Sequence, residues 1–184
     1  MDVARFGGDQ SIIVVRRGPV VEEPIYAFTG LDTMEVAAKV VECYRKCGNN
    51  AVVCVDGVGV GAGVVDRLKQ LGIRVIDVQS AAKPFDQRTY FNKRGEMYGK
   101  LKDWLQGDGC LPNDPDLFNQ LRVLEYQINR RLQIQLASKD DMRPALNGRS
   151  PDKADAIAYT FAADEMFDFM RSASARKVVA RPFV

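Results

Sequence analysis

The feature that most constrains the fold is an apolar run that ends in an aspartate and a glycine-rich turn, VVCVDGVGVGAGVVDRL, at Val52–Leu68. Apolar residues follow one another without alternation over 51–56, which is typical of a strand buried on both faces. Residues 61–71 then have the pattern of a helix, and 72–78 read as a second buried strand. Because strand–helix–strand connections are right-handed almost without exception, the two strands are predicted to be parallel.

The segments before this unit predict an antiparallel meander and a helix. Residues 11–18 and 24–30 are rich in strand-forming side chains and end at glycines, so we expect two strands there, with residues 2–5 as the first strand of the meander. A helix is predicted to begin with Thr33 as its N-cap and to end at Gly48.

The segments after the unit predict further helices and a hairpin. We expect a loop over 80–92, a helix over 93–107, strands over 122–128 and 131–136 joined by a tight turn at Asn129 and Arg130, and a polar loop over 137–149. A long helix should follow, with Ser150 as its N-cap and Pro151 at its first position. The order predicts one α/β domain over 1–170 and a basic, mobile tail over 171–184.

Histidine is absent from the sequence, and this absence removes whole classes of chemistry. Ser-His-Asp and Cys-His catalysis, histidine general bases and histidine-bound zinc all need this side chain. Hydrolytic chemistry would therefore use carboxylates, lysines or a metal ion held by oxygen. Mg²⁺ and Mn²⁺ are the hard cations that suit carboxylate ligands.

Other features of composition bear on the setting of the chain. The four cysteines form no CxxC pair, so we expect free thiols in a reducing cytoplasm, with a disulfide or a stray metal contact as the alternative. No apolar run of about 18 residues occurs, so no membrane span is expected. A strand has little room before Asp2, so we expect a domain cut from a longer protein, with an added initiator methionine.

The glycine-rich turn also permits a nucleotide site. Gly57, Gly59 and Ala62 satisfy the pattern G-x-G-x-x-A, and Asp77 follows at about the usual distance for a ribose ligand. However, Asp56 directly before the first glycine would repel a pyrophosphate, and such a fingerprint usually opens its fold. A plain strand–helix turn with a solvated aspartate is the remaining alternative.

Acidic residues at other points of the chain suggest a different role for Asp56. Asp2 lies on the first predicted strand, and Asp152 and Asp155 are three residues apart in the first turns of the last helix. Neighbouring strands would bring Asp2 and Asp56 together, and a helix packed across them would add Asp155. Such a cluster would repel itself unless cations bind between the carboxylates, and two divalent ions about 4 Å apart would fit.

Three strings in the sequence carry a family resemblance: DVARFGGDQSIIVVRRG, VCVDGVGVGAGVVDRLKQLG and GRSPDKADAIAYTFA. In this order they resemble the nuclease domain of the large terminase subunit of tailed bacteriophages, and FNKRGEMYGKLKDWL and LASKDD fit the same family. The resemblance extends over nearly the whole chain, and SPDKADA is its most specific part. It implies a ribonuclease H-like fold, with three antiparallel strands followed by parallel strands in one mixed sheet, flanking helices and an added β-hairpin.

The resemblance also implies a two-metal active site that holds Mg²⁺ or Mn²⁺ and cuts concatemeric DNA with little sequence preference. Carried over by motif, the ligands are Asp2, which would bridge both ions, Asp56 and Asp155. Asp152 is either a fourth ligand or only a favourable first-turn carboxylate. Asp9 is expected to tie the GGD turn by hydrogen bonds to its backbone, with metal contact as the alternative.

The implied partners are double-stranded DNA and, in a full-length protein, a preceding ATPase domain, the portal and the small terminase subunit, in the cytoplasm of an infected bacterium. The pattern G-x-x-x-x-G-K-[ST] is absent, so we expect neither ATP hydrolysis nor DNA translocation from this chain, and a monomeric isolated domain. Gly57, Gly59 and Gly61 are interpreted as allowing DNA and backbone to approach a strand end that holds metal.

Basic side chains that could contact DNA phosphates gather in a loop and helix start, at the predicted hairpin turn, and near the acidic cluster. They are Lys83, Arg88, Lys93, Arg94, Arg130, Arg131 and Lys153. An ordinary solvated surface is the alternative for each group. Two other functions stay open: another ribonuclease H-like nuclease, such as a Holliday-junction resolvase, and a DNA-binding or docking module whose carboxylates are no longer catalytic.

Overall fold

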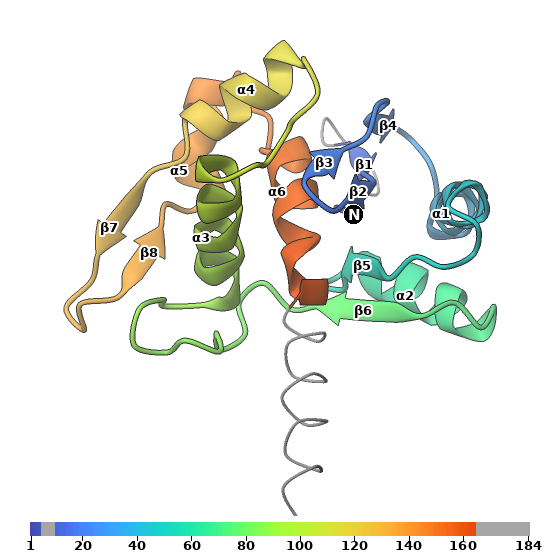
Figure 1. The fold of residues 1–184 in the computed structure, drawn as a ribbon, viewed down its shortest axis with the longest axis horizontal. Coiled ribbons are helices and arrows are strands. Elements are labelled where there is room, and N and C mark those ends of the chain that lie inside the picture. Colours follow the sequence, from blue (N-terminus) through green and yellow to red (C-terminus); the bar gives the residue numbers. More distant parts are fainter. Residues whose placement is uncertain (5–9, 165–184) are drawn as a thin grey trace, which may run out of the picture.

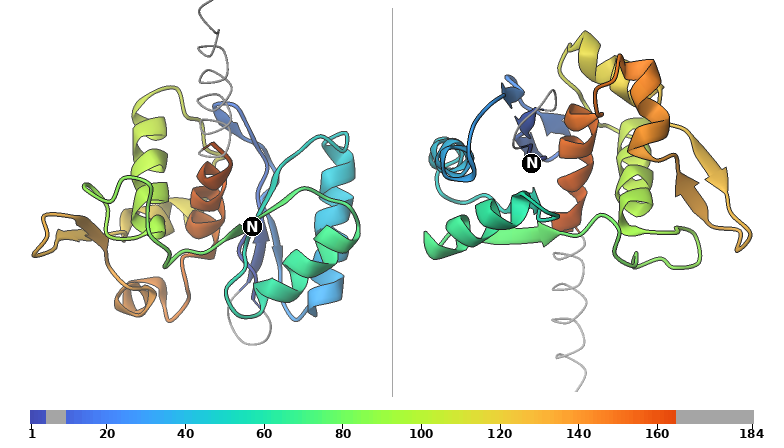
Figure 2. Two further views of the ribbon diagram at one scale, coloured as in Figure 1. Left: turned by 90° about the horizontal axis from the view of Figure 1, so that it is seen from below. Right: turned by 180° about the vertical axis from the view of Figure 1, so that it is seen from behind.

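Figure 1 shows a computed structural model of the chain, which describes residues 1–4 and 10–164. Helices α1 and α2 cover one face of the central sheet, and α6 lies between the other face and α3 (Figure 1, Figure 2). The strands are β1 (Ser11–Ile13), β2 (Arg16–Arg17), β3 (Val20–Val21), β4 (Tyr26–Phe28), β5 (Val53–Asp56), β6 (Val75–Val78), β7 (Tyr126–Ile128) and β8 (Ile134–Leu136). The helices are α1 (Thr33–Lys46), α2 (Gly61–Gln70), α3 (Lys93–Gln106), α4 (Pro115–Arg122), α5 (Lys139–Met142), the 3₁₀ helix η1 (Arg143–Leu146) and α6 (Asp152–Tyr159).

The first residues join the two halves of the sheet. The Met1 nitrogen donates to Cys54 O at 2.7 Å, and Met1 O accepts from Asp56 N at 3.1 Å. Asp2 and Ile12 exchange both of their backbone hydrogen bonds, at 3.1 and 2.9 Å. The segment Met1–Asp2 therefore lies between β1 and β5, and the strand order is β4, β1, Met1–Asp2, β5, β6.

These pairings confirm the predicted antiparallel meander and the predicted parallel pair of β5 and β6. The expected strand over 11–18 is divided in two, because β2 leaves β4 and pairs with β3. On β5, Cys54 and Val55 are both buried but belong to different apolar clusters. Cys54 faces the cluster of α3, α4 and α6, whereas Val55 faces the cluster of α1 and α2. Burial on both faces explains why this strand is apolar without alternation.

Helix α6 is capped from a distant element rather than from its own sequence. The prediction that Ser150 caps it and Pro151 opens it is wrong, because Pro151 is the N-cap and makes no side-chain capping bond. Instead, the buried side chain of Gln120 on α4 accepts from the backbone nitrogens of Lys153 and Ala154, at 2.9 and 3.1 Å. This long-range bond satisfies donors that a local cap would otherwise take.

The predicted limits of α6 and the N-cap of α1 also need correction. Thr33 is the first helical residue of α1, and Asp32 is its N-cap in a capping box with Glu35. The long final helix is interrupted at Thr160, and a further helical stretch covers 161–164. The rest of the predicted helix and the tail over 171–184 lie outside the described residues.

The segment predicted as a polar loop over 137–149 contains two short helices, α5 and η1. Ser138 caps α5 in a capping box with Asp141. The hairpin that precedes it is also shorter than predicted, because α4 continues to Arg122 and the turn covers 129–133 rather than two residues. The Asn129 side chain accepts from Arg131 N and Gln133 N and holds this wider turn.

The predicted free thiols are confirmed: Cys43, Cys47, Cys54 and Cys110 form no disulfide. Across residues 1–4 and 10–164, no helix has the length and apolar character needed to cross a membrane.

Candidate active site

Three aspartates that are distant in sequence meet beside the centre of the sheet. Asp2 lies on the central segment, Asp56 ends the neighbouring strand β5, and Asp155 lies in the first turns of α6, which packs against β1 and β5. All three belong to one electrostatic cluster, because Asp155, Asp152 and Asp56 each raise the pKa of Asp2. The structure thus brings together the three predicted catalytic residues.

Asp2 is unusually hard to ionise. Its burial, with 7% of its surface exposed, and the neighbouring carboxylates raise its pKa to about 7, and the Lys139 ammonium only partly opposes them. A neutral carboxyl near pH 7 is characteristic of a site where like charges crowd together. Such perturbed carboxyls are more frequent at functional sites than elsewhere.

Asp155 is fully buried, and its charge is balanced by several partners. Its Oδ1 accepts from the Tyr98 hydroxyl at 2.7 Å and from Arg94 Nε at 3.2 Å. Its Oδ2 lies 2.8 Å from Lys139 Nζ. Burial opposes ionisation of Asp155, but Arg94 and Lys139 outweigh it, so the pKa of this carboxyl is lowered. Asp155 is therefore held in its charged form.

Lys139 is a site residue that the sequence analysis missed. Its ammonium lies between two of the carboxylates, 2.8 Å from Asp155 Oδ2 and 3.6 Å from Asp2 Oδ2. Burial alone would lower the pKa of Lys139, but Asp155 and Asp2 raise it, so the group stays charged. The available signal was the string SKDD: its capping-box spacing predicts a helix start at Lys139, in a segment that we took for a loop.

Asp56 has a separate set of partners. Its Oδ2 accepts from the hydroxyl of Tyr159, a fully buried residue of α6, at 2.8 Å. Its Oδ1 accepts from Val58 N at 3.1 Å. These bonds fix the orientation of the carboxylate: the bond from Val58 N is local to the turn after β5, whereas the bond from Tyr159 comes from α6, 103 residues away in the sequence.

Asp152 and Asp9 are the two acidic residues for which the sequence analysis left two alternative roles. Asp152 is buried, and its Oδ2 accepts from Gln10 N at 2.9 Å, so it ties α6 to the start of β1 while its charge still acts on Asp2. Both interpretations of Asp152 are compatible with this position. Asp9 lies outside the described residues.

The chemistry of the donor set fits a hard divalent cation. Within the described part of the chain, no three histidine, cysteine or acidic side chains are close enough as they stand to hold one ion. The cluster is nevertheless made of carboxylate oxygens, and Asp155 Oδ2 is a buried oxygen whose partner is the Lys139 ammonium at 2.8 Å. A positive charge is already needed at this point, and the Lys139 ammonium supplies it.

The glycines after Asp56 are explained by packing and backbone conformation. A Cβ atom at Gly57 would collide with the Asp77 carboxylate, and one at Gly61 would collide with the backbone oxygen of Asp56. Gly59 has φ +64°, which L-residues with a side chain adopt rarely. The tight turn after β5 thus needs these glycines without any ligand nearby.

Of the seven basic residues proposed for DNA contact, four are exposed and three are partly or fully buried. Lys83, Arg88, Arg130 and Arg131 are exposed on the loop before α3 and on the hairpin turn. Lys93 is partly buried, 3.4 Å from Glu96 and over the ring of Phe85.

Two other predicted DNA contacts are placed elsewhere. Arg94 is buried and binds Asp155, so it belongs to the acidic cluster rather than to an exposed surface. Lys153 does not face the cluster: its Nζ lies 2.6 Å from Asp114 and 3.2 Å from Asp116 on the α4 side. The helical periodicity of the sequence does not reveal that Arg94 binds Asp155 or that Lys153 binds Asp114 and Asp116.

Comparison with known proteins identifies the fold. No protein-family model and no curated protein sequence matches the chain. Among solved structures, it is similar to the nuclease domain of the large terminase subunit gp2 of bacterial virus Sf6, with TM-score 0.71 and 22% identity over 85% of this chain and 84% of that one. A K428A mutant of that domain with manganese and β-thujaplicinol matches with TM-score 0.69 and 21% identity over the same shares, 85% and 84%.

The large terminase nuclease of thermophilic phage G20c matches with TM-score 0.63 and 16% identity, over 88% of this chain and 78% of that one. At these identities the similarity establishes the fold. The chain has the ribonuclease H-like fold of large-terminase nuclease domains, as the resemblance in sequence predicted.

Proposed function

We propose that this chain is a divalent-metal-dependent DNA endonuclease of the large-terminase type. The observation that carries the proposal is the convergence of Asp2, Asp56 and Asp155, from the start, middle and end of the sequence, on one electrostatic cluster. The solved structures with this fold are nuclease domains of large terminases, some with manganese or magnesium. Carboxylates held close together without histidine are the donor set that such ions prefer.

The metal ligands in this proposal are Asp2, Asp56 and Asp155, with Asp152 as a candidate fourth. Two bound Mg²⁺ or Mn²⁺ ions would supply charge stabilisation for the phosphodiester and a more acidic water. The protein itself contributes orientation, because the Tyr159 hydroxyl holds Asp56 and the Tyr98 hydroxyl holds Asp155. Outer partners of this kind set the direction of a ligand oxygen and thereby its affinity for the ion.

Arg94 and Lys139 balance the negative charge of the cluster in the absence of a bound ion. Arg94 stays fixed, because it also donates to Ala137 O at 3.0 Å. Lys139 is less constrained, since 35% of its side chain is exposed. We infer that the Lys139 ammonium moves away from Asp2 and Asp155 when divalent ions enter, and that it is then free to approach the DNA phosphate.

The substrate in this proposal is double-stranded DNA, read through its phosphates with little sequence preference. The exposed Lys83, Arg88, Arg130 and Arg131 are proposed as contacts, because they lie on the loop and hairpin beside α3. In a packaging motor the partners would be an ATPase domain, the portal and the small terminase subunit, in the cytoplasm of an infected bacterium. We propose that the isolated domain is a monomer.

A plasmid-nicking assay in Mn²⁺ tests the proposed function. Wild-type protein should nick supercoiled DNA, and Asp56→Asn and Asp155→Asn should each lose about 10²-fold or more of this activity, because a ligand carboxylate is removed. Asp66→Asn is a matched control, since Asp66 is an exposed carboxylate on α2. Equal nicking by all four proteins would refute the assignment.

A second candidate, a DNA-binding module without catalysis, is favoured by one observation. The Lys139 ammonium neutralises Asp155 and Asp2 without any metal, and such an internal ion pair is also what an inactive site would retain. The two candidates predict different results in calorimetric titration with Mn²⁺. A nuclease should bind Mn²⁺ and lose that binding in Asp155→Asn, whereas a docking module should bind DNA equally well with or without the ion.

A further inference from the structure

One aromatic side chain is held out into solvent on the loop between β6 and α3. Phe85 has 68% of its surface exposed, more than any other phenylalanine, tyrosine or tryptophan among residues 1–4 and 10–164. A single exposed apolar residue needs no explanation by itself, because such residues are common on protein surfaces. Phe85 differs from them because a buried side chain fixes its backbone.

The anchor is the carboxylate of Glu96, in the first turn of α3. Glu96 Oε2 accepts from Phe85 N and Oε1 accepts from Asp86 N, each at 2.9 Å. The Glu96 side chain is only 3% exposed, and a buried carboxylate needs such partners because an unpaired buried charge is costly. The backbone of Phe85 is thereby held in place, so the exposed ring has a defined position.

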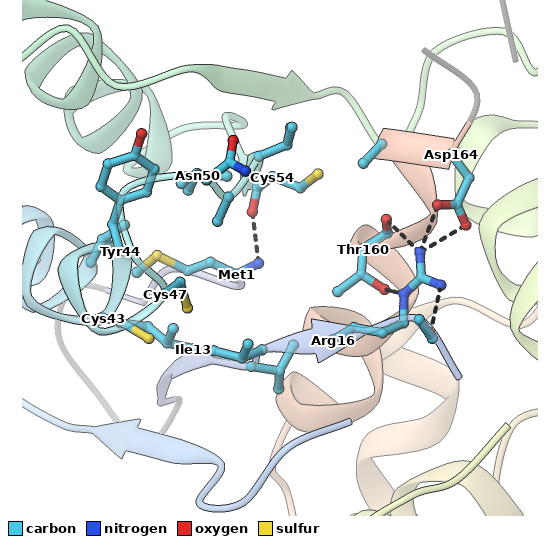
Figure 3. A pocket seen from close by; sticks show the side chains of 18 residues that line it. Met1, Ile13, Arg16, Cys43, Tyr44, Cys47, Asn50, Cys54, Thr160 and Asp164 are labelled. Atoms are coloured by element: carbon cyan, nitrogen blue, oxygen red, sulfur yellow. Dashed lines mark hydrogen bonds and ion pairs between the residues drawn. The ribbon is translucent and has the colours of Figure 1, made fainter. Parts of the chain in front are cut away.

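A cation covers one face of this ring. Lys93 Nζ lies 4.1 Å from the centre of the Phe85 ring, and the lysine side chain is only 13% exposed. A pair of similar length elsewhere in the chain is internal: Arg16 lies over the buried ring of Phe161 and is bonded to Asp164 (Figure 3). In the Lys93 pair the ring itself is on the surface, so its other face is open to a flat partner.

Both ends of the loop are tied to the acidic cluster. At its start, Ser80 Oγ donates to Asp56 Oδ2 at 3.5 Å. At its end, Arg94 N donates to Ser80 O at 2.9 Å, and the Arg94 side chain binds Asp155. Phe85 follows Ser80 by five residues, so it lies at most about 17 Å along the chain from that contact. This reach corresponds to about five nucleotides of one strand of a duplex.

Positive charge accompanies the ring. Lys83 and Arg88 are exposed on the same loop, two residues before and three residues after Phe85. A partner of this surface must therefore offer a flat face to the ring and negative charge to the cations. A nucleic acid strand offers both, as a base and its flanking phosphates. In a duplex the bases stack on one another, so only an unpaired base presents a free face.

We propose that Phe85 is a stacking platform for one unpaired base of the DNA strand that the candidate active site cuts. Lys83 and Arg88 contact phosphates beside that base. This inference rests on the proposed function, and it adds that the substrate is unpaired close to the cut. Cutting is then favoured where the strands separate at low cost, as at a mismatch. The stacking itself needs neither metal nor catalysis, so it can be measured without them.

Fluorescence anisotropy in EDTA tests the platform with two labelled probes, an oligothymidylate of about 12 nucleotides and a blunt duplex rich in G·C pairs. Phe85→Ala should weaken binding of the oligothymidylate about tenfold, because one stacked base is lost, and binding of the duplex by less than about twofold. Phe85→Tyr should keep the wild-type affinity, whereas Phe85→Leu, which is apolar but has no ring, should resemble Phe85→Ala.

Phe118→Ala is the matched control. Phe118 is also an exposed phenylalanine, but it lies on α4, at the far end of α3 from the loop (Figure 1, Figure 2). This variant should bind both probes as wild type does. A loss of oligothymidylate affinity equal to that of Phe85→Ala would contradict the assignment to Phe85.

Other outcomes would also overturn the inference. Equal loss of affinity for both probes in Phe85→Ala would assign the ring to paired duplex, and no loss for either probe would leave it to a protein partner. Wild-type affinity in Phe85→Leu would show an apolar contact without stacking. Plasmid nicking in Mn²⁺ with unchanged affinities would sink this inference alone. The expected affinities without any nicking by wild type would sink the proposed nuclease function alone.

Discussion

At the scale of single residues, two buried carboxyls of the acidic cluster have pKa values shifted in opposite directions. Asp155 is charged because Arg94 and Lys139 surround it, whereas Asp2 is driven toward its neutral form by burial and by its acidic neighbours. A site arranged in this way stores instability, which the cation of the proposed function would relieve. Functional sites commonly carry such a cost in stability.

Asp2→Asn should therefore stabilise the metal-free protein while abolishing nuclease activity. The folded-state pKa of Asp2 is raised to about 7 from 3.8, so the folded state binds a proton more tightly than the unfolded state, and stability is lost as pH rises through this window. The asparagine variant escapes that loss. In EDTA at pH 8 we expect it to be more stable by up to a few kcal/mol, since one pKa unit corresponds to about 1.4 kcal/mol.

Urea unfolding at pH 8 and pH 5 provides the measurement. The advantage of the variant should shrink at pH 5, where folded Asp2 is already protonated. An advantage that grows on acidification would show that the sign is wrong.

Lys139→Met should destabilise the metal-free protein and enlarge its response to Mn²⁺. The substitution leaves Asp155 and Asp2 without a nearby ammonium, and we expect a cost of about 1–3 kcal/mol, less than for a fully buried pair because 35% of the lysine side chain is exposed. Mn²⁺ should then raise the melting temperature more in the variant than in wild type. Lys46→Met, which removes an exposed lysine paired with Glu42, is the control and should respond like wild type.

At the scale of elements, the position of α6 decides where Asp155 lies. Its first turn is held by Gln120 from α4 and by Asp152, which accepts from Gln10 N beside β1. Beyond α6, Arg16 of β2 binds Asp164 at 2.7 Å and lies over the ring of Phe161, 4.3 Å from its centroid. The helix is thus anchored at both ends by residues from other elements.

Gln120→Ala should loosen the start of α6. The variant loses the acceptor for two backbone donors, and loss of a helix cap costs about 0.5–2 kcal/mol. Gln127→Ala is the matched control, since Gln127 is exposed on β7 and should change the free energy of unfolding by less than about 0.5 kcal/mol. Chemical unfolding of the two variants compares them, and an equal effect on both would contradict the capping role.

At the scale of the whole molecule, the basic loop and hairpin lie on the α3 side, whereas α2 lies beyond the sheet (Figure 1). The segments are tied together, because Gln133 Nε2 donates to Gln87 O at 2.7 Å and Phe91 N donates to Ile134 O at 3.0 Å. Arg88 and Arg130 are therefore carried on one connected surface. Such a surface would act on duplex DNA as a unit.

Arg88→Ala and Arg130→Ala should each weaken DNA binding about equally for different sequences. Each lost phosphate contact should reduce the slope of log K against log salt by about 1. Arg67→Ala on α2 serves as the control and should leave the slope unchanged. Fluorescence anisotropy at several salt concentrations gives these slopes, and slopes identical to wild type in both variants would remove this surface from the interface.

The sequence by itself determined the parts of this protein that depend on local pattern. The unbroken apolar run at 51–56 predicts a strand buried on both faces, and the β5–α2–β6 unit, α3 and the free thiols all follow from periodicity and composition. The family strings extend this to the fold and to Asp2, Asp56 and Asp155 as a group. The strands and helices are predictable because their hydrophobic patterns are local to each segment.

Only the tertiary structure decided which side chains neutralise that group. Lys139 reaches Asp155 from a segment that looked like a loop, Arg94 turns inward from a helix start that looked like a DNA surface, and Gln120 caps a helix more than 30 residues away. The physical reason is that charge pairing and long-range capping depend on distance in space. The sequence shows which groups need partners, but only the packing of distant elements supplies them.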